Sequence, residues 1–449
     1  MAVNISLSLL IATLAAAQTT ARSDKGYVVR VDSDTVWLDL TAADGAASGR
    51  AFDVYTEGAE LKHPVTGASL GRVQETIASG SIREVAEKFS TGWLTVRSMK
   101  PVKAGQHARF IAPTPEPAPA EPAKTARNGE TETRAPKTRG TALPYAATGM
   151  AVGDFDGAGR PQLALSSEDT IRLYAYPAAD GKVLAETTIP GIGLRILGLE
   201  AANLDGDKSD ELFVSVYNES FHRFETRVLK VESGKWLKVA ELPFLVRGYQ
   251  DAKGARVMAT QQVQDDKTFP LGTIYPLAYE DGKYAQGKPA FRHRRVSWIY
   301  GFTTAQIGEG EPAILFLTPV HNLRVQFGKE YWRSPDDDYG QTPVRVRWND
   351  KLLEFNPPMA LTYGEKGLDS LYAVRNMAAL GGLASPFGLF NKGELQSKRW
   401  NGLAFETVWK ADLSGCAQGM AVVETQGRKE IAVAVIGTAG RSSIWTFEP

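Results

Sequence analysis

The sequence predicts an all-β protein with a small N-terminal β-barrel or sandwich, a Pro/Ala-rich linker and a C-terminal β-propeller of six or seven blades. Three observations support this. Apolar and polar residues alternate before residue 111, a Pro-rich segment follows, and a weak repeat then recurs to the C-terminus. Period-two alternation is typical of half-buried strands, and a repeat of about 50 to 60 residues is typical of propeller blades.

Composition limits the classes of partner. The chain has 449 residues, more than one domain usually needs, and its 51 Lys and Arg residues balance its 51 Asp and Glu residues. Because no bulk positive charge is available for phosphate groups, we expect no nucleic-acid partner.

The N-terminus has the pattern of a secretory signal. An uncharged run extends from Ile5 to Leu14 and is followed by three Ala residues that end at Ala17. The run is too short to cross a bilayer comfortably, so residues 1–17 are predicted to be a signal peptide, with an uncleaved anchor as the alternative and no transmembrane span. The single Cys416 forbids an internal disulfide. These features predict a bacterial envelope protein, either periplasmic or secreted to the outer surface.

Residues 26–111 are predicted to form the small β domain. The run "VWLDLTAADGAASGRAFDVY" alternates strand residues with Gly-containing corners, and "HPVTG" at residues 63–67 is a hairpin turn. This part resembles a compact β domain of bacterial envelope proteins that is similar to the C-terminal domain of a flagellar T-ring protein. Residues 112–138 are rich in Pro, Ala, Glu and Lys and nearly free of large apolar residues, which predicts a disordered linker.

Residues 140–449 are predicted to form the propeller. Copies of a strand, a polar turn and two further strands begin near residues 149, 198, 247, 300, 358 and 418. The last copy holds only three obvious strands, so residues 142–147 are expected to supply its fourth strand. Such sharing would remove the free sheet edges of an open array.

The repeats resemble the FG-GAP or VCBS type, which is also found in integrin α-subunit heads. In that family a loop of the form D-x-D-x-D-G-x-x-D holds Ca²⁺. The resemblance implies a structural Ca²⁺ bound by the residues at the matching positions, which are Asn203, Asp205, Asp207 and Glu211. The alternative is that these residues only serve the turn through side-chain to backbone hydrogen bonds.

Two comparisons bear on this loop. An EF-hand does not fit, because its twelfth position would be Val214 where a bidentate Glu is needed. The matching loop of the preceding repeat keeps Asp154 and Asp156 but has Ala158 and Gln162 at the next ligand positions. That loop is expected to have lost the ion.

A binding surface is a further hypothesis. Arginine and aromatic residues cluster between Phe291 and Trp332, and both kinds are enriched at interaction hot spots. The alternative is that the aromatic side chains pack between blades. The residues of this hypothesis are Arg292, Arg294, Arg295, Trp298, Tyr300 and Trp332.

The sequence favours a non-catalytic binding or scaffold protein of the cell envelope, with a protein or a glycan as partner. The five His residues are scattered, and no pair of carboxylates has a pattern typical of glycoside hydrolysis. One alternative is a polysaccharide-acting enzyme with acids in the propeller funnel. Another is a structural component of an envelope assembly.

Overall fold

The computed structural model divides into two compact units. The first comprises Met1–Leu94 and Met99–Ile111, and the second comprises Thr95–Ser98 and Ala112–Pro449. No helix of the described residues is both long and apolar enough to cross a membrane. The predicted signal peptide and the hairpin turn at 63–67 lie outside the described residues. The structure describes residues 25–32, 35–48, 50–62, 69–97, 101–110, 131–251, 253–263, 273–288, 296, 298–307, 311–328, 330–349, 351–364, 367–378, 390–437 and 439–449.

The first unit is a closed barrel with the strand order β1-β2-β5-β4-β3-β6. The barrel closes because β6 pairs with both β1 and β3. Alternating side chains fill its interior, among them Val36, Leu38 and Phe52, all of which are fully buried. The elements are β1 (Lys25–Asp32), β2 (Thr35–Leu38), the 3₁₀ helix η1 (Ala42–Asp44), β3 (Ala51–Lys62), β4 (Ser69–Val85), β5 (Ser90–Arg97) and β6 (His107–Phe110).

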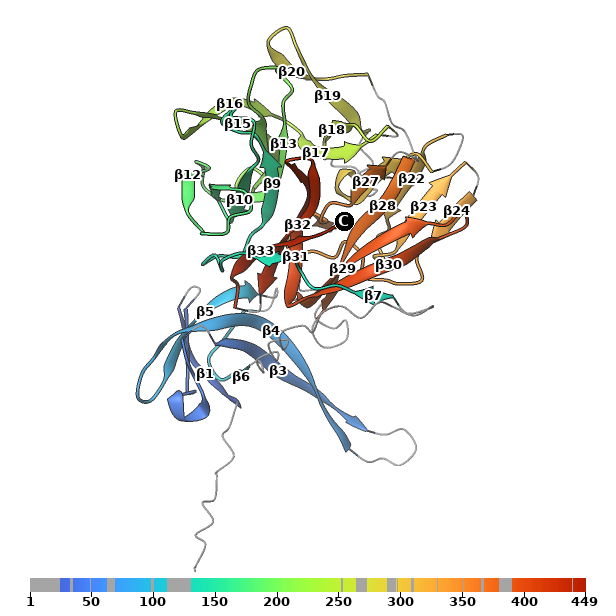
Figure 1. Ribbon diagram of the computed structural model, residues 1–449. Coiled ribbons are helices and arrows are strands. Elements are labelled where there is room, and N and C mark those ends of the chain that lie inside the picture. Colours follow the sequence, from blue (N-terminus) through green and yellow to red (C-terminus); the bar gives the residue numbers. More distant parts are fainter. Residues whose placement is uncertain are drawn as a thin grey trace, which may run out of the picture. The chain divides into compact units, whose positions relative to one another are not determined.

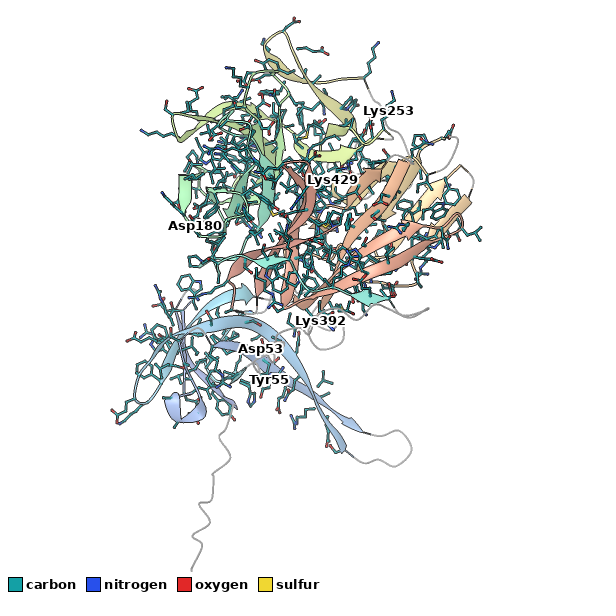
Figure 2. All side chains as sticks on the ribbon, viewed as in Figure 1. Asp53, Tyr55, Asp180, Lys253, Lys392 and Lys429 are labelled. Carbon is teal, nitrogen blue, oxygen red and sulfur yellow. The ribbon has the colours of Figure 1, made fainter. Side chains whose placement is uncertain are left out.

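Polar and aromatic side chains on β3 link it to its neighbours. Asp53 and Tyr55 lie two residues apart on this strand (Figure 2). Ser79 Oγ donates to Asp53 Oδ1 at 2.6 Å, while the ring of His107 stacks on Tyr55 with centroids 5.2 Å apart. Burial raises the pKa of Asp53, against the hydrogen bond from Ser79 and the nearby Arg109. This row of contacts therefore spans β4, β3 and β6.

In the residues that the structure describes, the second unit is a β-propeller of six blades, as the sheet order shows (Figure 1). The all-β prediction is confirmed, and the ring has the lower of the two predicted blade numbers. Blade 1 has the order β12-β11-β10-β9, and blades 2, 3 and 4 contain β13 to β16, β17 to β20 and β21 to β24. Blade 5 has the order β27-β28-β29-β30-β7, and blade 6 has the order β31-β32-β33-β8.

Burial in blades 1 to 3 decreases from the inner strands to the outer ones: β10 and β14 are almost fully buried, whereas β12, β16 and β20 are largely exposed. Blade 1 contains β9 (Gly149–Gly153), β10 (Gln162–Ser167), β11 (Thr170–Ala175) and β12 (Val183–Thr188). Blade 2 contains β13 (Leu194–Ala202), β14 (Glu211–Asn218), β15 (Arg223–Glu232) and β16 (Lys235–Leu242). Blade 3 contains β17 (Leu245–Gln250), β18 (Arg256–Gln261), β19 (Tyr275–Glu280) and β20 (Lys283–Gln286).

The remaining blades differ more in strand length. The 3₁₀ helix η2 (Ile299–Gly301) precedes blade 4, which contains β21 (Phe302–Ala305), β22 (Ala313–Leu317), β23 (Leu323–Phe327) and β24 (Glu330–Arg333). Blade 5 contains β27 (Ala360–Gly364), β28 (Gly367–Ala378), β29 (Phe390–Trp400), β30 (Phe405–Leu413) and β7 (Glu132–Thr133). Blade 6 contains β31 (Gly415–Thr425), β32 (Arg428–Gly437), β33 (Ser442–Phe447) and β8 (Thr138–Arg139).

The innermost strand of each blade begins close to a predicted repeat start. The observed starts are residues 149, 194, 245, 302, 360 and 415. Contacts join β9 to β13, β13 to β17, β17 to β21 and β27 to β31, and β31 touches β9, so the first and last blades meet. Apolar side chains fill the space between blades, as in the cluster that joins Phe155 and Leu173 of blade 1 to Leu212 and Trp236 of blade 2.

Residues just after the Pro-rich segment tie the last two blades together. In Figure 1 β7 lies along β30, with which it pairs in parallel, and β8 pairs with β33 as the outer strand of blade 6. Strand sharing between the two ends was predicted for residues 142–147, but the pairing residues are Thr138 and Arg139, with one further bridge from Leu143 to Ser442. The last residues of the predicted linker are therefore part of the propeller. We call residues 131–143 the strap.

Two stacked arginines hold the strap. Arg134 lies over the ring of Trp409 at 4.9 Å, and Arg139 lies over the ring of Trp445 at 4.2 Å. Because a cation over an indole contributes about 0.5–2 kcal/mol, we expect the double variant Arg134→Ala, Arg139→Ala to lose about 1–3 kcal/mol of unfolding free energy in urea denaturation. Arg160→Ala, which removes a more exposed arginine, is the control and should change little. Equal stability of both variants would contradict a role for the strap in closing the ring.

Candidate functional site

The centre of the propeller is occupied by the chain itself. Between blades 4 and 5, β25 (Arg345–Trp348) and β26 (Lys351–Glu354) form a two-stranded hairpin that belongs to no blade. We call residues 339–358, which include this hairpin, the axial hairpin. Side chains from the innermost strands of blades 3 and 6 bond to its backbone: Arg247 Nη2 donates to Asn356 O at 3.3 Å, and Gln418 Nε2 donates to Phe355 O at 3.2 Å. Residues 355 and 356, which follow β26, therefore lie against the innermost strands at the axis.

Further hydrogen bonds hold the axial hairpin from other blades. Trp298 Nε1 donates to Glu354 O at 2.6 Å, and Asn376 Nδ2 of β28 donates to Gln341 O at 2.7 Å. Thr342 Oγ1 donates to Gln418 Oε1 at 2.7 Å. Because buried backbone carbonyls need partners, these amide and indole groups satisfy a segment that forms no blade ladder.

Apolar side chains secure the same segment. Along β25 burial alternates, so that Val346 and Trp348 point inward and Arg347 points to solvent. Trp348 meets the ring of Phe224 at 6.2 Å, and Phe355 meets Trp298 at 5.4 Å, both edge to face. The hairpin is thus part of a core cluster shared with blades 2, 3 and 4.

The acids nearest the axis are paired with cations. Glu200 of β13 is buried, with Oε1 3.0 Å from Arg247 Nη1 and its other oxygen bonded to Arg256. Glu354 of the axial hairpin lies 3.1 Å from Arg345 and 3.4 Å from His321. Each of these two carboxylates therefore has a cationic partner within the chain.

Little empty space remains beside the hairpin. A cavity of about 10 Å³, close to the space of one water molecule, is lined among others by Met150, Gly198, Arg247, Tyr300 and Gln418. It is far smaller than the few hundred Å³ of a typical small-molecule site. In the part of the chain that the structure describes, the axis beside the hairpin is therefore tightly packed.

Gln250 bridges three blades elsewhere at the axis. Its backbone N–H donates to Thr303 Oγ1 at 3.2 Å, and its carbonyl accepts from Thr304 Oγ1 at 2.8 Å. Its side-chain Oε1 accepts from the N–H of Leu361 at 2.9 Å. One residue on β17 thereby connects blades 3, 4 and 5.

The predicted Ca²⁺ loop joins β13 and β14 and contains a lysine ammonium. Nζ of Lys230, on β15, is 2.6 Å from Asp205 Oδ2, 2.5 Å from Asp207 Oδ2 and 3.8 Å from Glu211 Oε1. The Lys230 side chain is 10% exposed. Its hydrogen bond lowers the pKa of Asp207. Asp205 and Asp207 therefore both contact the ammonium group of Lys230.

The other two predicted ligands organise the loop. Asn203 Oδ1 accepts from the N–H of Gly206, whose φ of +75° suits glycine, and Asn203 Nδ2 donates to Asp207 O at 2.7 Å. Glu211 is fully buried and accepts from the N–H of Leu204 at 2.8 Å. Burial raises the pKa of Glu211. In the part of the chain that the structure describes, no three His, Cys, Asp or Glu side chains are placed to hold a metal ion.

The corresponding loop of blade 1 is organised by its own backbone. Asp154 accepts from the N–H groups of Ala158 at 3.0 Å and Gly159 at 2.7 Å. Gln162 Nε2 donates to Asp156 Oδ2 at 2.9 Å. Both carboxylates of this loop therefore accept hydrogen bonds from within the loop.

The predicted binding surface of arginine and aromatic residues needs correction for its three aromatic members, which the structure describes. Trp298 and Tyr300 are 8% and 3% exposed, because both rings pack against Phe355 of the axial hairpin. Trp332 is half-buried and packs against Phe405 with ring centroids 5.6 Å apart. These rings are packing residues. Arg292, Arg294 and Arg295 lie outside the described residues.

A different set of exposed side chains surrounds the axial hairpin. Ile192, Phe221 and Val320 are 89%, 73% and 68% exposed. Each is within three residues of a contact to the hairpin, made by Arg195, Phe224 and His321 respectively. On the hairpin itself Arg347 and Leu352 are exposed and paired across the two strands. We call Ile192, Phe221, Val320, Arg347 and Leu352 the hairpin face. Sequence reasoning missed it because its members come from four separate segments.

A second buried charge lies between blades 4 and 5. Lys398 of β29 is 1% exposed and donates to Thr407 Oγ1 at 2.8 Å, with Asp336 3.9 Å away. The ring of Tyr339 lies 5.5 Å from its ammonium, and Arg375 and Glu394 also act on it. Burial lowers the pKa of Lys398 to about 8, although Asp336 opposes this shift.

Comparisons with known proteins concern the fold. No protein-family model and no curated protein matches the chain. Among solved structures it is similar to an oxidoreductase (glucose dehydrogenase) from Thermus thermophilus, at 14% identity, with a TM-score of 0.38 and coverage of 70% of this chain and 99% of that chain. It is also similar to the WD40 repeats of RRP9, at 11% identity, with a TM-score of 0.38 and the same two coverages. The propeller assignment itself rests on the sheet order described above.

The buried pair of Arg247 and Glu200 should be essential for stability. Arg247→Met leaves the Glu200 carboxylate buried with only the more exposed Arg256, so we expect a loss of about 3 kcal/mol in the free energy of unfolding. Arg256→Met is the matched control, because it removes the exposed partner of the same acid and should cost less. Chemical denaturation measures both. A larger loss for Arg256→Met would contradict this ranking.

Lys398 should make stability depend on pH. The folded pKa of about 8 lies below the ordinary lysine value of 10.5, so below pH 8 both states are protonated and the folded state carries the full cost of a buried charge. Between these values only the unfolded state holds the proton, and stability rises with pH. Lys398→Met should therefore stabilise the protein by about 1–3 kcal/mol at pH 7, with a gain that shrinks toward pH 10 in urea denaturation.

The control for this measurement is Lys392→Met, which removes an exposed lysine of the same strand (Figure 2). Its stability difference from the wild type should be small and nearly constant over the same pH range. A Lys398→Met difference that stays constant with pH would contradict the argument.

Proposed function

We propose that the protein is a non-catalytic binding or scaffold protein of the bacterial cell envelope, exported by its N-terminal segment, and that it binds a protein partner through the hairpin face. The observation that carries this proposal is the filled axis. Propellers commonly bind small ligands in the central channel, and here the axial hairpin occupies that position.

The electrostatics of the axis favour binding over hydrolysis. A polysaccharide-acting enzyme needs two carboxylates that face one bond, one of them with a raised pKa. Glu200 and Glu354 each contact arginine, and the cavity beside the hairpin has room for about one water molecule. Function is therefore assigned to the outer surface of the loops.

The hairpin face has the composition of a protein-binding surface. Three of its apolar side chains are more than two-thirds exposed, and the face also carries an exposed arginine. Exposed apolar side chains that gather in a patch are typical of interaction sites. Their loops are anchored on the axial hairpin, so they are presented on a common support. A rigid support lowers the entropy cost of binding.

The side chains of the hairpin face favour a protein partner over a glycan. Sugars stack on exposed aromatic rings, but Trp298 and Tyr300 are buried and only Phe221 offers an exposed ring in this set. Arg195, Arg223 and Arg347 lie on or beside the face, where Glu219 pairs with Arg195. A protein surface with apolar side chains and carboxylates therefore fits better than a glycan.

A photo-cross-linking experiment tests the proposal in cells. A photoreactive amino acid at position 221 should give one defined adduct with an envelope protein, identified by mass spectrometry. Position 403 is the control, because Leu403 is 86% exposed on the turn between β29 and β30, away from the axial hairpin in sequence. The same adduct from both positions, or none from position 221, would refute the assignment of the face.

Binding measurements with the purified protein and its identified partner then test how much the hairpin face contributes to affinity. Phe221→Ser combined with Arg347→Glu should weaken binding of the identified partner at least tenfold, since hot-spot residues each contribute about 1–2 kcal/mol or more. Leu403→Ser should leave the affinity unchanged. Isothermal titration calorimetry measures both.

A further inference from the structure

The resemblance of the 203–211 loop to a Ca²⁺ loop conflicts with the position of Lys230. We propose that the Lys230 ammonium is the permanent cation of this loop, so that blade 2 needs no metal and the loop binds a divalent cation only when Lys230 is removed.

The first argument is geometric. Lys230 Nζ bonds to Asp205 Oδ2 at 2.6 Å and to Asp207 Oδ2 at 2.5 Å, from a neighbouring strand of the same blade. A Ca²⁺ ion needs six to eight oxygen ligands at about 2.3–2.6 Å. An ion between these two carboxylates would therefore have to occupy the space of the ammonium.

The second argument concerns the remaining ligands. The Glu211 carboxylate accepts hydrogen bonds from the N–H of Leu204 at 2.8 Å, the N–H of Asp205 at 3.2 Å and the hydroxyl of Tyr284 at 3.0 Å. Asn203 uses its side chain on the turn. Two of the four family ligands are thus committed to the loop backbone, so the donor set does not fit the ion well.

The third argument is one of charge. Lys230 is 10% exposed and Asp205 is 17% exposed, so the pair is largely removed from water. Carboxylates placed side by side repel each other unless a cation lies between them. A lysine supplies that charge from within the chain and, unlike an ion, cannot dissociate.

Metal dependence of stability tests the proposal. The melting temperature of the wild type should be the same in CaCl₂ and in EDTA. Lys230→Met should melt at least about 2–4 °C lower than the wild type in EDTA, and CaCl₂ should recover part of that loss. A Ca²⁺-dependent rise in the wild type would overturn the proposal, as would a Lys230→Met variant that does not respond to Ca²⁺.

Further variants keep the test decisive if Lys230→Met folds poorly. Lys230→Met with Asp205→Asn and Asp207→Asn removes the repulsion as well as the ligands, so it should melt higher than Lys230→Met in EDTA and show no Ca²⁺ response. Lys238→Met removes an exposed lysine of the adjacent strand β16 and serves as the matched control. Equilibrium dialysis of the folded wild type against radioactive Ca²⁺ gives an independent readout, in which stoichiometric binding would refute the proposal.

Discussion

The architecture depends on how the chain fills the centre of its ring. Six innermost strands meet around the axis, and backbone and side-chain polar groups there must find partners because water has little access. The axial hairpin supplies those partners. Asn356 makes two such hydrogen bonds. Its carbonyl accepts from Arg247, and its side-chain amide donates to Gly340 O at 2.7 Å. The same segment also contacts the exposed loops around it. The residues that fill the axis therefore also support the hairpin face.

Several buried charged side chains of this protein form ion pairs with other side chains of the chain. Lys230 of β15 pairs with Asp205 and Asp207 on the loop between β13 and β14, and Glu200 of β13 pairs with Arg247 of β17. Such pairs add little net stability compared with apolar side chains of similar volume, but a missing partner is costly. They therefore fix which strands are neighbours more than they stabilise the fold. Lys398 is the exception, because its nearest carboxylate is 3.9 Å away and its charge is only partly compensated.

Sequence periodicity predicted the blades well and the axis poorly. Turn-rich repeats define where β9 and β13 begin, because local alternation and turn chemistry decide those elements. The axial hairpin carries no such signal, since Val346 and Trp348 alternate like any strand and only the ring shows that they have no blade. The acidic loop was recognised from its spacing, yet Lys230 lies 23 residues from Asp207. Nothing local to the loop could indicate that this lysine pairs with it.

The strap has a consequence for the order of events during synthesis. Thr138 bonds to Thr446 across 308 residues of sequence, and Arg134 reaches the carbonyl of Pro449. The segment that completes blade 6 thus leaves the ribosome long before its partner strand exists. Blade 6 cannot acquire its outer strand until β33 has been synthesised. The ring therefore stays open while its first five blades are made, and the contact that closes it forms last.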